Sequence, residues 1–178
     1  TVSPGSSNSC ESSSQPQCWW SLRNVIERSG TSTTETSYAE KMDMLRDRLA
    51  DSVRRRLVAD VPLGTFLSGG IDSSLIVAIA QKVASQPVQT FTIGFEEQAY
   101  DESRYATAIA ERLGAPQVTH VVSAAEAQSV IPRLPAIYDE PFADPSQIPT
   151  FLVSKLARKR VTVCLSGDGG DELFGGYN

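Results

Sequence analysis

The chain has 178 residues, of which 40% are hydrophobic and 21% are charged, and its formal net charge is −5. This size and composition support one hydrophobic core with an additional tail. The negative charge argues against a general nucleic-acid-binding protein. The longest apolar run, Leu75 to Ala80, is too short to span a bilayer. We therefore expect neither a nucleic-acid partner nor a membrane partner.

The three cysteines fit neither a metal-site spacing nor a disulfide framework. Reduced thiols are favoured over a bridge between Cys10 and Cys18. No basic region followed by an apolar block opens the chain, so we expect no signal peptide. A cytoplasmic location is the resulting expectation.

Residues 1–37 differ in composition from the rest of the chain. Serine crowds residues 1–17, and a second Ser/Thr run covers residues 29–37. Such segments bury too little apolar surface to offset the entropy of ordering them, which predicts a linker or tail. The apolar stretch 19–26 between them is expected to pack on the domain, with a protein-binding motif as the alternative.

Residues 38–178 alternate between helical and strand patterns, which predicts an α/β domain. We expect a twisted parallel sheet of about four or five strands flanked by helices. Strands are predicted at 61–67, 88–95, 117–122 and 161–165. Helices are predicted at 38–60, 75–84, 101–113, 124–138 (broken by Pro132 and Pro135) and 146–160.

Three of these helices carry more specific expectations. Apolar residues four positions apart predict inward-facing stripes, namely Leu75, Ile79 and Val83 in one helix and Tyr105, Ile109 and Leu113 in another. Gly114 is placed as a C-cap. The helix 38–60 carries Arg54-Arg55-Arg56 near its end, where positive charge complements the helix dipole. We favour a solvated helix end there over a phosphate-binding role.

The stretch 68–74, Ser-Gly-Gly-Ile-Asp-Ser-Ser, lies between a predicted strand and a predicted helix. Its glycines permit close approach of a ligand, and the first amide groups and the dipole of the helix favour an anion. Three hydroxyl donors complete a phosphate site: Ser68, Ser73 and Ser74. Asp72 would repel a bare phosphate, which indicates that it holds Mg²⁺ against the phosphates. An ordinary βα turn with an N-capping Asp or Ser is the alternative.

A second stretch rich in glycine and carboxylates, 166–177, follows the last predicted strand. In open parallel sheets, ligands bind outside the carboxyl ends of the strands, so both stretches should face one crevice. Asp72 and Asp171 would then hold one Mg²⁺ from opposite sides of the phosphates. The acidic loop 139–146 is either a plain connector or a loop that binds a metal or an amine.

The stretch 68–74 resembles the pyrophosphate loop (PP-loop) of the ATP pyrophosphatases. Four blocks extend this resemblance to the asparagine synthetase family (glutamine-hydrolysing type), in its C-terminal synthetase domain: 61–74, 91–96, 138–146 and 165–177. The resemblance covers residues 38–178. It implies a ligase that uses ATP and Mg²⁺ to adenylylate a small carboxylate, aspartate or a similar one, and releases pyrophosphate. Ammonia from a glutaminase domain, or from another source, then forms an amide.

The resemblance also implies roles for individual residues. The residues that contact ATP are Leu67, Ser68, Gly69, Gly70, Asp72, Ser73, Ser74, Ile93, Gly94, Ser166 and Gly167, with Leu67 and Ile93 contacting adenine through their backbones. Asp72 and Asp171 are implied as the Mg²⁺ ligands. Asp168 stands where the family commonly has a glutamate tied to formation of the intermediate, and is the implied catalytic residue.

Full members of that family begin with a glutaminase domain and continue into a helical region with a catalytic lysine. We therefore expect a partial synthetase domain that is inactive alone, and the resemblance allows an oligomer in the full-length parent. Two alternatives stay open: another PP-loop ATP pyrophosphatase, and a truncated, non-catalytic nucleotide-binding module.

Overall fold

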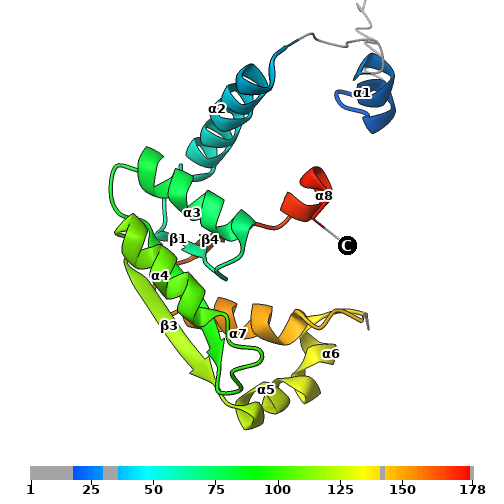
Figure 1. Cartoon of the computed structure of the whole chain (residues 1–178). Coiled ribbons are helices and arrows are strands. Elements are labelled where there is room, and N and C mark those ends of the chain that lie inside the picture. The colour runs from blue at the N-terminus through cyan, green and yellow to red at the C-terminus, as the bar shows by residue number, and fades with distance from the viewer. Residues whose placement is uncertain (1–17, 30–35, 141–142, 177–178) are drawn as a thin grey trace, which may run out of the picture. The chain divides into compact units, whose positions relative to one another are not determined.

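The computed structural model describes residues 18–29, 36–140 and 143–176 (Figure 1). The chain divides into two compact units, residues 1–41 and residues 42–178. Most of the two predicted serine-rich segments lies outside the described residues, as do Cys10, part of the acidic loop (141–142) and the end of the second glycine-rich stretch (177–178).

In the first unit, the apolar stretch forms helix α1 (Leu22–Ser29), which the sequence did not predict. The helix begins with the amide of Val25 donating to the carbonyl of Ser21 at 3.1 Å. None of its residues is buried.

The second unit is built on a parallel four-stranded sheet in the order β3-β2-β1-β4. The strands are β1 (Leu63–Phe66), β2 (Gln89–Phe95), β3 (Gln117–Val122) and β4 (Val163–Leu165). The predicted α/β class, parallel direction and approximate strand number are confirmed. Strands β1 and β4 begin later than predicted, because Pro62 has no amide hydrogen to give to a ladder. Its carbonyl instead accepts from the amide of Thr162 at 2.9 Å.

One helix of this unit precedes the first strand, and at least one helix follows each strand. The helix bounds are α2 (Tyr38–Arg56), α3 (Ile71–Val83), α4 (Ser103–Leu113), α5 (Ala124–Val130), α6 (Leu134–Ile137), α7 (Gln147–Ala157) and α8 (Gly170–Phe174). The predicted helix 124–138 is interrupted by a 3₁₀ turn at Ile131–Arg133, as its prolines indicated. Gly114 caps α4 with a positive φ of 62°, as predicted.

The two faces of the sheet are covered by different parts of the chain (Figure 1). The chain moves from β1 to β2 to β3 through α3 and α4, which pack on one face around Leu67, Val77 and Ala106. It then returns across the sheet to β4, beyond β1, and α7 packs on the other face against Phe91. Right-handed crossovers in opposite directions along the sheet produce this arrangement.

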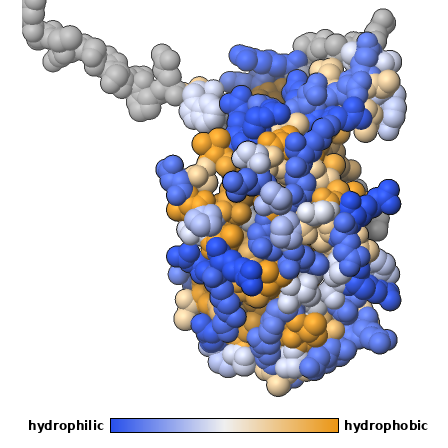
Figure 2. Space-filling model, turned by 90° about the vertical axis from the view of Figure 1, so that its left-hand side faces the viewer, coloured by the Kyte–Doolittle hydropathy of each residue, from blue (hydrophilic) through white to orange (hydrophobic). Residues whose placement is uncertain are grey.

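The helix faces differ in part from the prediction. Ile79 and Val83 pack in the core, but Leu75 is 42% exposed, and the inner row of α3 runs through Val77 and Ala80. In α4, Tyr105 is 53% exposed, and the buried positions are alanines. Small residues face inward because α4 packs closely: a Cβ on Gly69 would come within 2.9 Å of the Ala106 nitrogen. Apolar side chains left outside gather between hydrophilic ones on the face shown in Figure 2.

Candidate functional site

The strand order reverses between β1 and β4, and this reversal creates the site. The chain leaves β1 toward β2 on one side, whereas β4 lies on the other side of β1. In open parallel sheets the loops diverge at such a point and leave a crevice outside the carboxyl ends of the strands. The loops after β1 and β4 together line a cleft of about 940 Å³ there. The predicted meeting of the two glycine-rich stretches in one crevice is therefore observed.

Most of the residues expected to bind ATP or metal, and the expected catalytic residue, line this cleft: Ser68, Gly70, Asp72, Ser73, Ser166, Gly167, Asp168 and Asp171. The other expected residues (Leu67, Gly69, Ser74, Ile93 and Gly94) lie beside it in the sheet, the first loop or the first helical turn. The cleft lining also includes residues that were not assigned a role from sequence, among them Asp144, Ser146 and Glu172. The sequence signal that pointed to Asp144 and Ser146 was the alternative in which the acidic loop 139–146 binds a metal or an amine.

The first loop is closed by hydrogen bonds around the hydroxyl of Ser73. This side chain is 9% exposed and lies 2.9 Å from the hydroxyl of Ser68. It accepts from the Ser68 amide at 3.3 Å and donates to the Gly70 carbonyl at 3.2 Å. The hydroxyl of Ser74 donates to the same carbonyl at 2.6 Å. The loop therefore holds a defined conformation through its own serines.

Helix α3 begins at Ile71, four residues earlier than predicted, so Asp72, Ser73 and Ser74 lie in its first turn. The first i to i−4 bond runs from the Ser74 amide to the Gly70 carbonyl, at 3.1 Å. The amides of residues 71–73 precede that bond and point out of the helix start, which also carries the positive end of the dipole. A phosphate group is the ligand that such a helix start favours.

The second loop touches the first through its glycines. A Cβ on Gly167 would lie 2.7 Å from the backbone nitrogen of Ser73. A Cβ on Gly170 would lie 2.5 Å from the carboxyl carbon of Asp72. Real Cβ atoms do not approach so closely, so only glycine lets the loop after β4 lie against the start of α3. Figure 1 shows the result, with α8 beside the first turn of α3.

The residues expected near adenine lie where the sheet meets the first loop. The Leu67 side chain is 1% exposed, and the partly buried side chain of Ile93 packs against the core of the opposite face. The Leu67 carbonyl accepts from the hydroxyl of Thr92 at 2.8 Å and keeps a second lone pair. Along a strand, the backbone N–H and C=O groups of successive residues point to alternate neighbouring strands. The backbone groups of Ile93 therefore point toward the β1 side of β2, as those of Phe91 do, but beyond the last residue of β1.

Gly94 ends the row of residues expected near the nucleotide. A Cβ there would come within 2.8 Å of the Ser103 hydroxyl and 2.9 Å of a carboxylate oxygen of Asp101. This glycine lets the start of α4 pack on β2. The Asp101 carboxylate accepts from the amides of Ser103 at 3.1 Å and Phe95 at 3.4 Å. Hydrogen bonds from Ser103 hold the pKa of Asp101 below its usual value.

Charge in the cleft is of one sign among the described residues. The lining contains no lysine or arginine, but it contains the carboxylates of Asp72, Asp144, Asp168, Asp171 and Glu172. Hydrogen bonds from the side chain and the amide of Ser146, the latter at 2.8 Å, lower the pKa of Asp144. The Ser166 hydroxyl donates to Asp168 at 2.9 Å. A polyphosphate entering this cleft needs cations with it.

The carboxylates of the cleft are oxygen donors of the kind that bind hard cations. Among the described residues, no group of three His, Cys, Asp or Glu side chains forms an all-protein metal site. Mg²⁺ does not need one, because it is commonly bound by one or two carboxylates together with substrate phosphates and water. Asp72 in the first turn of α3 and Asp171 in the first turn of α8 both line the cleft and offer oxygen donors of the kind that hard cations prefer.

A parallel sheet with glycine-rich loops at its reversal point is the arrangement of the nucleotide-binding α/β proteins. The fold is similar to that of a solved structure, the glutamine-dependent NAD⁺ synthetase from Acinetobacter baumannii in complex with ADP. The TM-score is 0.52 at 24% identity, over 73% of this chain and 26% of that one.

The asparagine synthase family model matches residues 44–178, and the chain belongs to this family. It is 46% identical over 134 residues to asparagine synthetase [glutamine-hydrolyzing] 1 of Bacillus subtilis, covering 75% of this chain and 21% of that protein. It is 47% identical over 137 residues to a putative asparagine synthetase [glutamine-hydrolyzing] of Mycobacterium bovis, covering 77% and 21%. The chain thus spans about a fifth of the length of these relatives. Within the described residues, no helix has the length and apolar character needed to cross a membrane.

Proposed function

We propose that this chain supplies the ATP-binding site of a glutamine-dependent asparagine synthetase. The observation that carries the proposal is the single cleft formed by the loops after β1 and β4. The first backbone amides of α3 lie on one side of this cleft, and carboxylates lie on both sides. Membership in the asparagine synthase family and the names of its relatives support the same conclusion.

The first loop is the proposed binding site of the β- and γ-phosphates. The backbone amides of residues 71–73 point toward that position, and Ser68 and Ser73 line the cleft beside it. In the structure these hydroxyls bond to one another and to the loop backbone. Their reorientation toward phosphate oxygens exchanges one hydrogen bond for another, at little net cost. The backbones of Leu67 and Ile93 are the proposed adenine contacts, and Ser166 and Gly167 lie on the opposite wall.

Asp72 and Asp171 are the proposed holders of Mg²⁺. When bound with the phosphates, the ion would neutralise charge on them and on the departing pyrophosphate. The acidic lining supports this proposal, because without a cation these carboxylates repel a polyphosphate.

The proposed reaction has two steps. A carboxylate oxygen of aspartate, or of a similar acid, forms a bond to the α-phosphorus of ATP, the bond to the β-phosphate oxygen breaks, and pyrophosphate leaves. Ammonia from a glutaminase domain or another source then attacks the acyl carbon, and AMP leaves as the amide forms. We assign Asp168, which accepts from the Ser166 hydroxyl, to receive a proton from the attacking nitrogen.

The cytoplasm, where thiols stay reduced, is the proposed location of the protein.

Calorimetric titration with Mg·ATP tests the binding site. We expect Asp72→Asn to weaken binding by about tenfold or more, because a hard-cation ligand is lost while size is kept. Asp47→Asn, on the exposed surface of α2, removes the same charge far from the cleft and should change affinity less than about twofold. Equal affinity of the wild-type chain and Asp72→Asn in the presence of magnesium would contradict the proposal.

A further inference from the structure

A second cleft lies at the opposite end of the sheet, where the strands begin. It has a volume of about 880 Å³ and is open to solvent. We call it the amino-end groove. The end of α2, the end of α3 and the residues that precede β1, β2 and β4 form its walls. None of its lining residues belongs to the cleft proposed for ATP.

Positive charge borders the amino-end groove. Arg54 and Arg160 line it, and each belongs to a run of basic residues, 54–56 and 158–160. The positive charges of the three arginines at the end of α2 are only partly neutralised by nearby carboxylates. Asp51 is shared by Arg55, whose Nε donates to it at 2.7 Å, and by Arg54, which lies 3.9 Å away.

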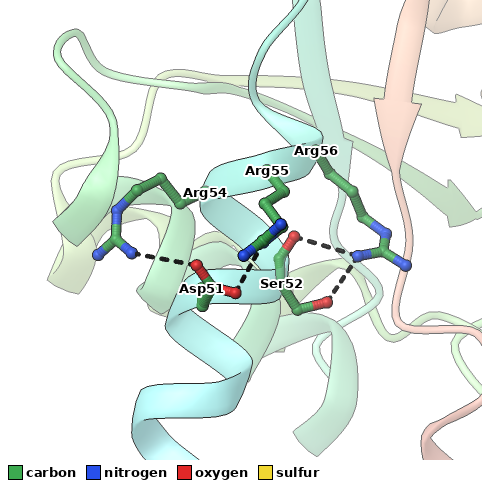
Figure 3. Close-up of polar contacts among 5 residues, drawn as sticks. All are labelled: Asp51, Ser52, Arg54, Arg55 and Arg56. Carbon is green, nitrogen blue, oxygen red and sulfur yellow. Dashed lines mark hydrogen bonds and ion pairs between the residues drawn. The ribbon is translucent and has the colours of Figure 1, made fainter.

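The remaining arginines of the two runs pair with neutral partners or with none. Arg56 donates to the hydroxyl and the carbonyl of Ser52, at 2.6 and 3.1 Å. Figure 3 shows the Arg54 and Arg56 guanidinium groups on opposite sides of the helix. Among the described residues, Arg160 has no ion-pair partner. The groove therefore has surplus positive charge, in a chain whose net charge is −5.

Between the two arginines the lining combines apolar residues with Ser85, Gln86 and Gln89, and the valines at 88 and 161 are buried. The apolar lining residues include Leu57, Val58, Leu63, Val83, Val88 and Val161. Val58 is 84% exposed, although the residues around it belong to the hydrophobic core. The exposed Val58 side chain thus lies beside Arg160, which has no ion-pair partner among the described residues, and Arg54, which shares Asp51 with Arg55. Exposed apolar atoms beside arginine are typical of a binding surface.

We propose that the amino-end groove binds an acidic segment of a partner protein, in which apolar side chains alternate with aspartate or glutamate. Carboxylates match the planar guanidinium fork, which binds them through two parallel hydrogen bonds. Apolar side chains of the same segment would cover Val58 and its neighbours, a surface for which inorganic phosphate or a nucleic-acid backbone has no counterpart. The groove and the ATP cleft lie at opposite ends of the strands, so the two ligands bind without competition.

Fluorescence polarisation with a labelled ten-residue peptide of alternating leucine and glutamate tests this proposal. We expect saturable binding at low salt that weakens at high salt, because the charged groups lie at a solvent-exposed rim. Arg54→Ala combined with Arg160→Ala should weaken binding about tenfold or more. Arg56→Ala combined with Lys159→Ala removes the same charge from residues outside the groove lining, and should weaken binding less than about threefold.

The apolar part has its own variant. Val58→Ser should weaken binding of the leucine–glutamate peptide about threefold or more. Because Val58 is 84% exposed, this substitution leaves the core intact. A peptide with serine in place of leucine should bind more weakly, and one with lysine in place of glutamate should not bind. Equal loss in the two double variants, no effect of Val58→Ser, or no binding of the leucine–glutamate peptide would overturn the proposal. Unchanged Mg·ATP affinity of each variant would show that its fold is kept.

Discussion

The two ends of the sheet present opposite kinds of surface. At the carboxyl end, two loops meet through glycines and backbone atoms, and the lining is acidic. At the amino end, long arginine side chains border a groove lined by a mixture of apolar and uncharged polar residues. A surface made from backbone is rigid and tolerates few substitutions, because any added atom displaces a main chain. A surface made from long exposed side chains tolerates substitution, and its ligand contacts can be changed without changing the fold.

The largest expected contrast comes from one apolar residue at each end. Leu67→Ala should destabilise the protein by about 2–5 kcal/mol, because this side chain is 1% exposed beneath the first loop and leaves a cavity. Val58→Ala should stay within about 0.5 kcal/mol, because 84% of the side chain is exposed. Urea denaturation of both variants measures the difference. Similar losses in the two would remove the contrast between the ends.

The contact between the two loops gives the next largest effect. Gly167→Ala should destabilise the protein by roughly 1–3 kcal/mol, because the added Cβ would lie 2.7 Å from the Ser73 nitrogen. The same displacement should weaken the binding of Mg·ATP by about tenfold. Gly70→Ala is the control: the nearest atom to its Cβ is 3.4 Å away, and its φ of −70° suits any residue. Denaturant midpoints and calorimetry report the two effects. If both alanine variants were equally stable, loop contact would not explain the glycine at 167.

The smallest effect concerns the strand that joins the two ends. Burial raises the pKa of the Cys164 thiol on β4 to about 11. At pH 8 only about a thousandth of this thiol is ionised, so it should react slowly with a thiol reagent. In the Cys10→Ser, Cys18→Ser double variant, the labelling rate should rise about tenfold per pH unit between pH 8 and pH 10. Rapid labelling at pH 8 without unfolding would show that β4 is more accessible than its packing indicates.

Local patterns predicted most of this architecture. The alternation of strand and helix patterns indicated a parallel sheet. The rule for the carboxyl ends of strands predicted that the stretches 68–74 and 166–177 share one cleft, and described residues of both stretches line it. The glycines at 167 and 170 confirm that logic, because each allows a contact with the first turn of α3. The roles of individual residues toward ATP and Mg²⁺ stay predictions.

Features that depend on close packing were harder to predict. An apolar residue at every fourth position predicted that Leu75 of α3 and Tyr105 of α4 face inward, but both are exposed. In α4 small residues face inward instead, because the first loop lies against Tyr105 and Ala106. The start of α3 at Ile71 was missed because glycine and serine resemble loop residues. The amino-end groove joins Arg54 to Arg160, which are far apart in the sequence, and only the strand order brings them together.

The strand order also determines when each part of the molecule can form. Thr65 of β1 pairs with Thr90 of β2, only about twenty-five residues onward, but with Leu165 of β4 about a hundred residues onward. Closing the longer loop costs more chain entropy and slows the pairing that requires it. The β1–β2–β3 portion can therefore assemble while the edge beside β1 is still unpaired. The cleft lies at that late-forming junction, so a refolding chain would acquire its secondary structure well before it regains affinity for a nucleotide.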